Sequence, residues 1–283
     1  MRHRRWLRNV TLFALLVSVL PTVFAQRGSG QGTSESLAVV HVDVIDGTGA
    51  PIRRDQTVVI SSGRITAIGE AGRTSVAPTA RKIDATGKYL IPGLWDLHVH
   101  TRYDGIDHLR LFIANGVTTV RDMGGPSEHF DLLKQWRQEI ARGNRIGPRI
   151  VAAGALIDGP GSELDFSTIV RGRDEGRATV RRLKESGADF VKVYDLLDRD
   201  SFFAIVDEAR VQKLPIAGHP PLAVGLRATS EAGVLSVEHM PRVILASSDR
   251  EDDIMSRAAN LGPAEVPRLV ADSRSRFSQC CRV

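Results

Sequence analysis

Short apolar segments alternate with helical periods over residues 93–240 of the chain. The candidate strands are Gly93–His100, Val117–Met123, Arg149–Gly154, Phe190–Asp195, Pro215–His219 and Val234–Met240. Between them apolar residues recur at helical spacing, as at Phe130, Leu133 and Trp136, and Asp200 is expected to cap a further helix. Repeated β/α units with short links indicate an α/β fold with a parallel sheet, either a doubly wound layer or a (β/α)8 barrel.

Residues 37–92 have a different pattern, in which short strands are separated by turn residues. Strands are expected near residues 38–44, 57–60, 64–69, 82–85 and 88–91. Strands of this length and spacing are typical of a small β-sandwich. A segment of about 55 residues built from strands alone would be marginally stable, so we expect it to pack on the β/α segment that begins at Gly93.

The first 36 residues have the pattern of an export signal and a linker. A basic stretch (1–8), an apolar run of 11 residues (10–20) and small or short residues at Val23 and Ala25 predict a signal peptide over residues 1–25. The apolar run is too short to cross a hydrocarbon core of about 30 Å, although an uncleaved membrane anchor remains an alternative. Residues 26–36 are rich in Gly, Ser and Gln and indicate a flexible linker. The mature chain is expected to be periplasmic or extracellular, with no stable membrane span.

The net charge of +5 comes mostly from this first segment. Four arginines lie within residues 1–25, and without them 34 basic residues remain against 33 acidic ones. No basic patch remains to favour a nucleic-acid partner. The two cysteines, Cys280 and Cys281, are adjacent, which disfavours a disulfide between them, and they are too few for a structural zinc site.

Polar residues on the strands favour the barrel over the doubly wound layer. Asp96, His98 and His100 alternate with apolar residues and therefore share one face of their strand. Four histidines and one lysine lie at or near the C-terminal ends of the predicted strands: His98, His100, Lys192, His219 and His239. A barrel builds its active site at these ends. We therefore predict an incomplete (β/α)8-type TIM barrel of about six β/α units over residues 93–245.

The four histidines have the chemistry of a metal site. His98 and His100 point the same way and can bind one ion, while His219 and His239 can supply a second. Neutral imidazoles suit zinc or a similar divalent metal. Any one of them alone would be more simply a structural residue, but their repeated placement at strand ends favours ligation. The other histidines, His3, His41, His108 and His129, fall outside this pattern.

Lys192 has two interpretations. An ammonium group inside a barrel is costly unless it pairs or loses its proton. It either forms a buried salt bridge, to Asp96 or Asp122, or becomes neutral beside two cations. In the second case it can take up carbon dioxide as a carbamate, whose two oxygens can bridge the metals.

Four motifs occur in order along the chain: Leu90–His100, Val191–Tyr194, Ala217–His219 and Val237–Met240. Together with the preceding β segment they resemble the amidohydrolase superfamily over about residues 37–240. The chain is most similar to its exported, dipeptidase-like branch, which is related to imidazolonepropionases. The resemblance implies two metal ions, a metal-activated hydroxide that attacks a carbonyl carbon, and a small amide, peptide or cyclic amide as substrate.

Other polar residues near these motifs have less defined roles. Tyr194 lies on the same strand face as Lys192 and either hydrogen-bonds the substrate or packs in the barrel mouth. Arg121 and Asp122 end the second barrel strand and are placed to contact substrate, on position alone.

The chain departs from the family pattern after Met240. The family's eighth strand ends in an aspartate that binds metal and moves a proton, and no residue of the irregular segment 246–283 has that context. Gly93–Val283 is also shorter than a typical barrel of about 250 residues. The sequence therefore resembles a C-terminally truncated family member, and the open edges of an incomplete barrel would favour pairing with other chains.

Three functions remain open from the sequence. The first is a metal-dependent hydrolase of carbon–nitrogen bonds. The second is a catalytically inactive remnant that folds or binds metal without turnover. The third is a secreted binding protein of the doubly wound class, in which the histidines coincide by chance.

Overall fold

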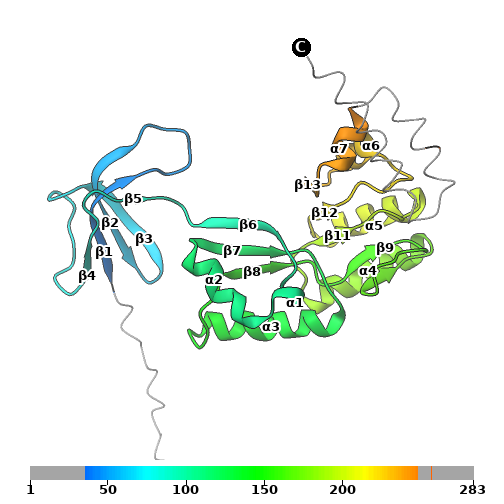
Figure 1. Ribbon diagram of the computed structural model, residues 1–283, viewed down its shortest axis with the longest axis horizontal. Coiled ribbons are helices and arrows are strands. Elements are labelled where there is room, and N and C mark those ends of the chain that lie inside the picture. The colour runs from blue at the N-terminus through cyan, green and yellow to red at the C-terminus, as the bar shows by residue number, and fades with distance from the viewer. Residues whose placement is uncertain (1–35, 248–255, 257–283) are drawn as a thin grey trace, which may run out of the picture. The chain divides into compact units, whose positions relative to one another are not determined.

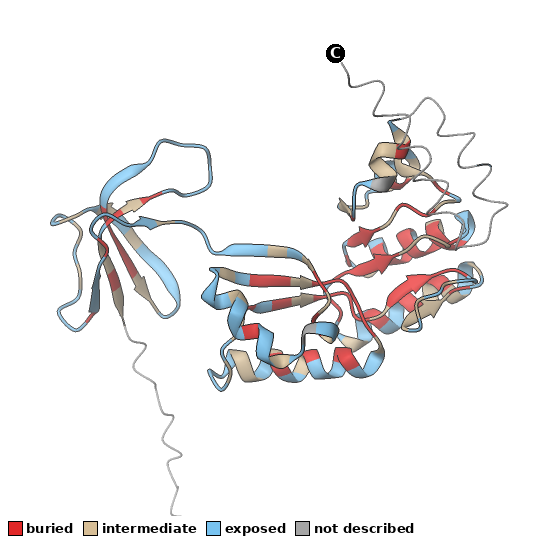
Figure 2. Ribbon diagram, viewed as in Figure 1, coloured by how far each residue is buried: buried red, intermediate tan, exposed pale blue. Residues whose placement is uncertain are grey.

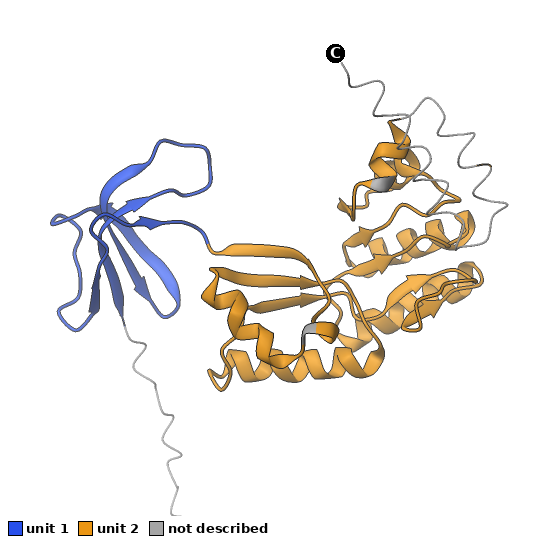
Figure 3. Ribbon diagram, viewed as in Figure 1, with its two compact units in different colours: residues 1–92 blue, residues 93–283 orange. Residues whose placement is uncertain are grey.

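The computed structural model describes residues 36–247 and residue 256. The chain divides into two compact units, residues 1–92 and 93–283 (Figure 3). The predicted signal peptide, almost all of the predicted linker and nearly all of the segment 246–283 lie outside the described residues. None of the helices in the described part of the chain is long and apolar enough to cross a bilayer.

The first unit is built on one five-stranded sheet. Its strands are β1 (Leu37–Val44), β2 (Arg53–Ser61), β3 (Arg64–Glu70), β4 (Arg81–Asp84) and β5 (Tyr89–Leu90). Strands β1, β2 and β3 are antiparallel neighbours, while β4 and β5 pair in parallel with β1. Its small apolar core consists of Val42, Val44, Val58 and Ala85.

The second unit is a partial α/β barrel with parallel strands (Figure 1). Its strands are β6 (Leu94–Val99), β7 (Val117–Asp122), β8 (Arg149–Ala152), β9 (Leu156–Asp158), β10 (Ser167–Ile169), β11 (Val191–Val193), β12 (Ile216–Gly218) and β13 (Ser236–Val237). One sheet has the order β6-β7-β8 and the other β10-β9-β11-β12-β13. A backbone hydrogen bond from Asp189 N–H to Ala152 C=O links them at the start of β11. Strands β6, β7, β8, β11, β12 and β13 therefore follow one another around the unit in chain order, and β9 pairs with β11.

Helices connect these strands. They are α1 (Thr101–Asp104), α2 (Leu109–Ala114), α3 (Ser127–Ala141), α4 (Arg173–Ser186), α5 (Arg199–Val211), α6 (Leu226–Glu231) and α7 (Pro241–Ala246), with a 3-10 turn at Ile106–His108. Burial is concentrated on the strands and on one side of the long helices (Figure 2). On α3 the buried side carries Phe130, Leu133 and Trp136, which belong to the same core as Ile150 of β8. The helical spacing in the sequence thus marks the face that covers the sheet.

The strands predicted for the second unit are present but shorter than expected, and three details differ. Helix α5 is capped by Asp198 and not by Asp200, because the Asp198 carboxylate accepts hydrogen bonds from the Ser201 N–H and hydroxyl while Asp200 lies inside the first turn. His219 follows β12 by one residue, and His239 follows β13 by two. Strands β9 and β10 have no counterpart in the sequence prediction.

We expect α3 to contribute to stability through one face only. Leu133 is 1% exposed and its neighbour Leu132 is 39% exposed. Leu133→Ala should lower the free energy of unfolding by about 2–5 kcal/mol, because it leaves a cavity in the core. The matched variant Leu132→Ala should change it by no more than about 0.5 kcal/mol. Chemical denaturation of both variants measures the difference, and equal losses would contradict the assigned orientation of α3.

Candidate active site

One pocket of about 140 Å³ in the second unit collects the polar residues at the strand ends. It is lined by His98, His100, Tyr103, Leu156, Leu164, Phe166, Lys192, Tyr194, His219 and His239. The fold therefore brings together all six residues that the sequence singled out as ligands or catalytic groups. Their functional roles stay predictions, but their proximity is a property of the fold.

The imidazole rings lie close to one another across the pocket. The ring centres of His98 and His239 are 4.6 Å apart, those of His219 and His239 5.1 Å, and those of His98 and His100 5.3 Å. His98 lies on β6, while His219 and His239 come after β12 and β13 of the other sheet. Rings from both sheets thus meet over one small cavity. The Tyr194 ring packs against His219 with a centre-to-centre distance of 4.1 Å.

Lys192 is buried in the middle of β11, with 1% of its surface exposed. Its Nζ atom has no hydrogen-bond partner among the described residues, so the salt bridge to Asp96 or Asp122 that the sequence left open is not formed. Burial, reinforced by the positive charge of Arg121 and opposed by Glu238 and Asp195, lowers the pKa of Lys192 to about 8. The lysine is therefore more easily deprotonated than one in water.

The carboxylate of Glu238 fixes the ring of His98. Nδ1 of His98 lies 2.7 Å from Oε2 of Glu238. Burial alone would raise the pKa of Glu238, but hydrogen bonds with His98 and Ser236 and the charge of Arg121 lower it to about 2. The ionised carboxylate can only accept, so Nδ1 donates and Nε2 is left for the pocket.

A backbone carbonyl holds His100, whose Nδ1 donates to the Gly124 carbonyl over 3.1 Å. Behind it lies the buried carboxylate of Asp122, which accepts hydrogen bonds from the backbone N–H groups of Thr101 and Gly124 and from the Thr101 hydroxyl. The same hydroxyl lies 3.0 Å from Nε2 of His129. Asp122 therefore fixes the residue after His100 and also the residue whose carbonyl binds its ring.

His219 is oriented in a similar way by Asp195. Its Nδ1 is 3.3 Å from Oδ1 of Asp195, which also accepts from Arg242 over 2.8 Å. Burial opposes ionisation, but the bonds and charges of His219 and Arg242 lower the pKa of Asp195 to about 2. Nε2 of His219 is buried and has no partner within the described part of the chain.

The donors in this pocket fit a divalent metal. No three His, Cys, Asp or Glu side chains in the described part of the chain converge tightly enough to hold an ion as they stand. Two pocket nitrogens nevertheless lie buried without partners among the residues described, Nζ of Lys192 and Nε2 of His219. Burial also lowers the pKa of His100, His219 and His239, which favours the neutral imidazole that metals bind. Nδ1 anchored by an acceptor and Nε2 directed to the site is the usual arrangement of a ligating histidine.

Sequence reasoning missed the acceptors behind these rings. Glu238 and Asp195 directly adjoin His239 and Tyr194 in the chain, but nothing in the spacing tells which ring each one binds. Arg121 and Asp122, expected to contact substrate, instead contact protein groups behind the site.

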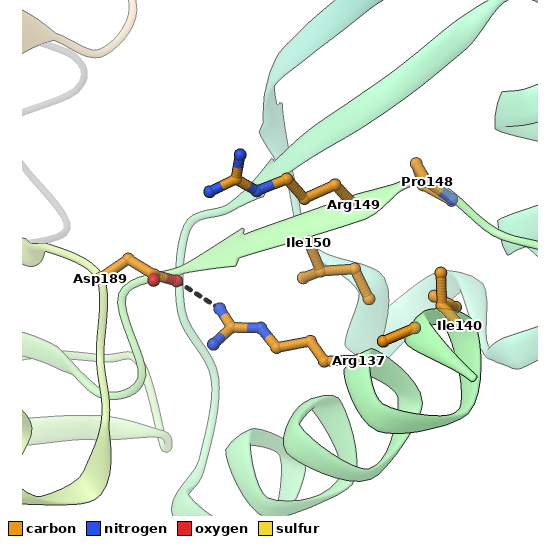
Figure 4. Close-up of a pocket in the computed structure, with 7 residues that line it drawn as sticks. Arg137, Ile140, Pro148, Arg149, Ile150 and Asp189 are labelled. Carbon is orange, nitrogen blue, oxygen red and sulfur yellow. Dashed lines mark hydrogen bonds and ion pairs between the residues drawn. The ribbon is translucent and has the colours of Figure 1, made fainter. Parts of the chain in front are cut away.

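A larger cavity of about 410 Å³ lies elsewhere in the unit (Figure 4). Its lining includes Ile140, Pro148 and Ile150, beside an ion pair between Arg137 and Asp189. Arg149 begins β8 and Asp189 precedes β11, so this cavity adjoins the N-terminal ends of the strands. It has no histidine in its lining and is the poorer candidate despite its size.

Comparison with known proteins gives related enzymes and the same fold. A dihydroorotase from Trichlorobacter lovleyi is 25% identical over 223 residues, which cover 76% of this chain and 45% of that protein. An imidazolonepropionase from Stenotrophomonas maltophilia is 40% identical over 67 residues, or 23% of this chain and 16% of that protein. A solved amidohydrolase superposes with a TM-score of 0.64 at 21% identity, over 85% of this chain and 73% of that one. The chain thus spans less than half the length of these curated relatives, and no family model matches it.

The hydrogen bonds to Asp122 should make it essential for the folded site. Asp122→Ala leaves the buried N–H groups of Thr101 and Gly124 without acceptors, so the free energy of unfolding should fall by at least about 2 kcal/mol. The control is Asp131→Ala on the outer side of α3, where an exposed ion pair with Lys134 is lost and the change should stay below about 1 kcal/mol. Denaturation curves compare the two, and a small effect of Asp122→Ala would show that the network is dispensable.

Proposed function

We propose that this chain, which belongs to the amidohydrolase superfamily, is a metal-dependent hydrolase of carbon–nitrogen bonds. The observation that carries the proposal is the meeting of four imidazoles and an unpartnered lysine in one pocket of the described residues. We place its substrates among small amides, peptides and cyclic amides. The matched imidazolonepropionase supports the branch related to that enzyme.

The proposed cofactors are two divalent ions, with zinc as the first candidate. His98 and His100 would hold one ion, His219 and His239 the other, and Lys192, as a carbamate formed with carbon dioxide, would lie between them. Such ions, when bound, lower the pKa of a water molecule and polarise a substrate carbonyl. The buried Nζ of Lys192, which has no hydrogen-bond partner in the described part of the chain, supports the carbamate, because carbon dioxide reacts with the neutral amine.

The remaining pocket residues would bind and shield the substrate. Tyr194 lies beside His219 and is our candidate for a hydrogen bond to substrate. Burial, together with the negative charges of Asp195 and Asp158, raises the pKa of Tyr194, so its hydroxyl is a donor at neutral pH. Leu156, Leu164 and Phe166 supply an apolar wall that would limit the access of water.

We also propose that the chain acts outside the cytoplasm. This part of the proposal rests on the basic, apolar and small-residue pattern of residues 1–25. The near balance of charge in the remaining chain fits a small-molecule substrate and gives no support to a nucleic-acid partner.

The first test is metal content together with hydrolysis. Purified protein supplied with zinc and bicarbonate should bind about two ions per chain by elemental analysis and should hydrolyse members of a panel of dipeptides and cyclic amides. Removal of the metal by a chelator should abolish turnover, and zinc should restore it. Metal without turnover would favour the inactive alternative, and a folded chain without metal would refute the proposal.

Two lysine variants, one in the pocket and one on the surface, make this test specific. Lys192→Met removes the buried amine, and we expect it to lower the zinc content by about one ion per chain and hydrolysis by at least about 100-fold, because the proposed bridging group is lost. Lys184→Met, on the exposed side of α4, is the matched control and should leave both quantities unchanged. Equal behaviour of the two variants would exclude Lys192 from the site.

A further inference from the structure

Arg121 lies behind the pocket at the centre of a network that joins three strands. Its Nε donates to the Leu97 carbonyl over 2.6 Å, its Nη1 to the Ser236 hydroxyl over 2.8 Å, and its Nη2 to Oε1 of Glu238 over 2.6 Å. Leu97 belongs to β6, Arg121 to β7 and Ser236 to β13. The guanidinium group thus spans from the first sheet of the unit to the far strand of the second.

Two of these contacts act on the same histidine. Leu97 directly precedes His98, so the bond to its carbonyl holds the backbone from which the ring extends. Glu238 binds the His98 ring through Oε2 while Arg121 binds Oε1. One arginine therefore fixes the start of the side chain and also the acceptor that sets the orientation of the ring.

The two oxygens of the Glu238 carboxylate have different hydrogen-bond partners. Oε2 accepts a hydrogen bond from His98 Nδ1, and Oε1 accepts hydrogen bonds from Arg121 and from the Ser236 hydroxyl. Glu238 is 6% exposed, so water does not compete freely for it. Without Arg121 this buried carboxylate would lose its ion pair and a charge-assisted hydrogen bond, and only the Ser236 hydroxyl would oppose its rotation away from His98.

We propose that Arg121 and Glu238 are positioning residues for His98: Arg121 locks Glu238, and Glu238 holds His98 in the Nδ1–H tautomer with Nε2 directed into the pocket. The inference rests on the proposed function, since its consequence is a ring prepared for a metal. Neither residue touches the substrate in this scheme. Acceptors behind ligating histidines typically contribute a factor of roughly 10–100 in metal affinity.

The decisive variant is Glu238→Gln, which keeps the shape of the side chain. An amide has one oxygen and one NH2 group, so it cannot accept from both His98 and Arg121 in the present arrangement. We expect the dissociation constant for zinc, measured by competition with a chelator, to rise roughly 10- to 100-fold. Arg121→Met should weaken zinc binding in the same direction by about 10-fold.

The chain offers a matched control pair on α4 and α5. Glu208 is 7% exposed and accepts from Arg181 and Gln212, so its burial and bonding resemble those of Glu238. Glu208→Gln and Arg181→Met should cost stability without changing zinc affinity. If Glu238→Gln binds zinc within about twofold of the parent chain, the positioning role is refuted, whatever its effect on stability.

A second readout separates this inference from the proposed function. In metal-free protein with ¹⁵N-labelled histidine, long-range ¹H–¹⁵N spectra should show His98 protonated at Nδ1 in the parent chain and redistributed between the two nitrogens in Glu238→Gln. If the parent chain binds no zinc, the proposed function fails and these spectra alone decide whether Glu238 sets the tautomer. An unchanged His98 signal in the variant would overturn the inference in either case.

Discussion

The burial of Lys192 without a hydrogen-bond partner in the described part of the chain is the constraint on which the site depends. An isolated ammonium inside a protein is costly, and its neighbours Glu238 and Asp195 are already bound to other cations and rings. The pocket therefore has carboxylates close enough to influence the lysine, but none that pairs with it among the residues described. A structural lysine would be expected to find a salt bridge here, whereas a lysine kept free is available for chemistry.

The carboxylates are engaged elsewhere because they orient the histidines. Glu238 serves His98, Asp195 serves His219, and Asp122 acts on His100 through Thr101 and Gly124. Each of these acidic groups is itself fixed by an arginine or by backbone N–H groups. The site thus has an inner layer of nitrogens with few partners and an outer layer in which each of these carboxylates is hydrogen-bonded. This division fits the proposed metal site, in which a metal would take the place of the missing partners.

The sequence singled out the residues that meet in the inner layer but not the contacts of the outer layer, for a physical reason. Alternation along β6 and the recurrence of polar residues at strand ends are local signals, so His98, His100, Lys192, His219 and His239 could be found without coordinates. The contact between Arg121 and Glu238 joins residues 117 positions apart, and it depends on how two sheets curve toward each other. Local rules were also insufficient at Asp198, where the residue nearest the helix start, and not the next aspartate, formed the cap. Strand lengths in the second unit were overestimated because the pairing of β11 and β12 ends before the polar residues Asp195 and His219.

His239 is held in a different way from the other three rings. Its backbone adopts a left-handed conformation with φ of 64°, which costs a residue with a Cβ on the order of 1–3 kcal/mol. Its ring lies between those of His98 and His219, each of which is anchored from behind by a carboxylate. This left-handed residue lies between the end of β13 at Val237 and Met240, the N-cap of α7. His239 is itself exposed, and its ring contacts those of His98 and His219. The position of the His239 ring therefore depends on the carboxylates that orient these two neighbours.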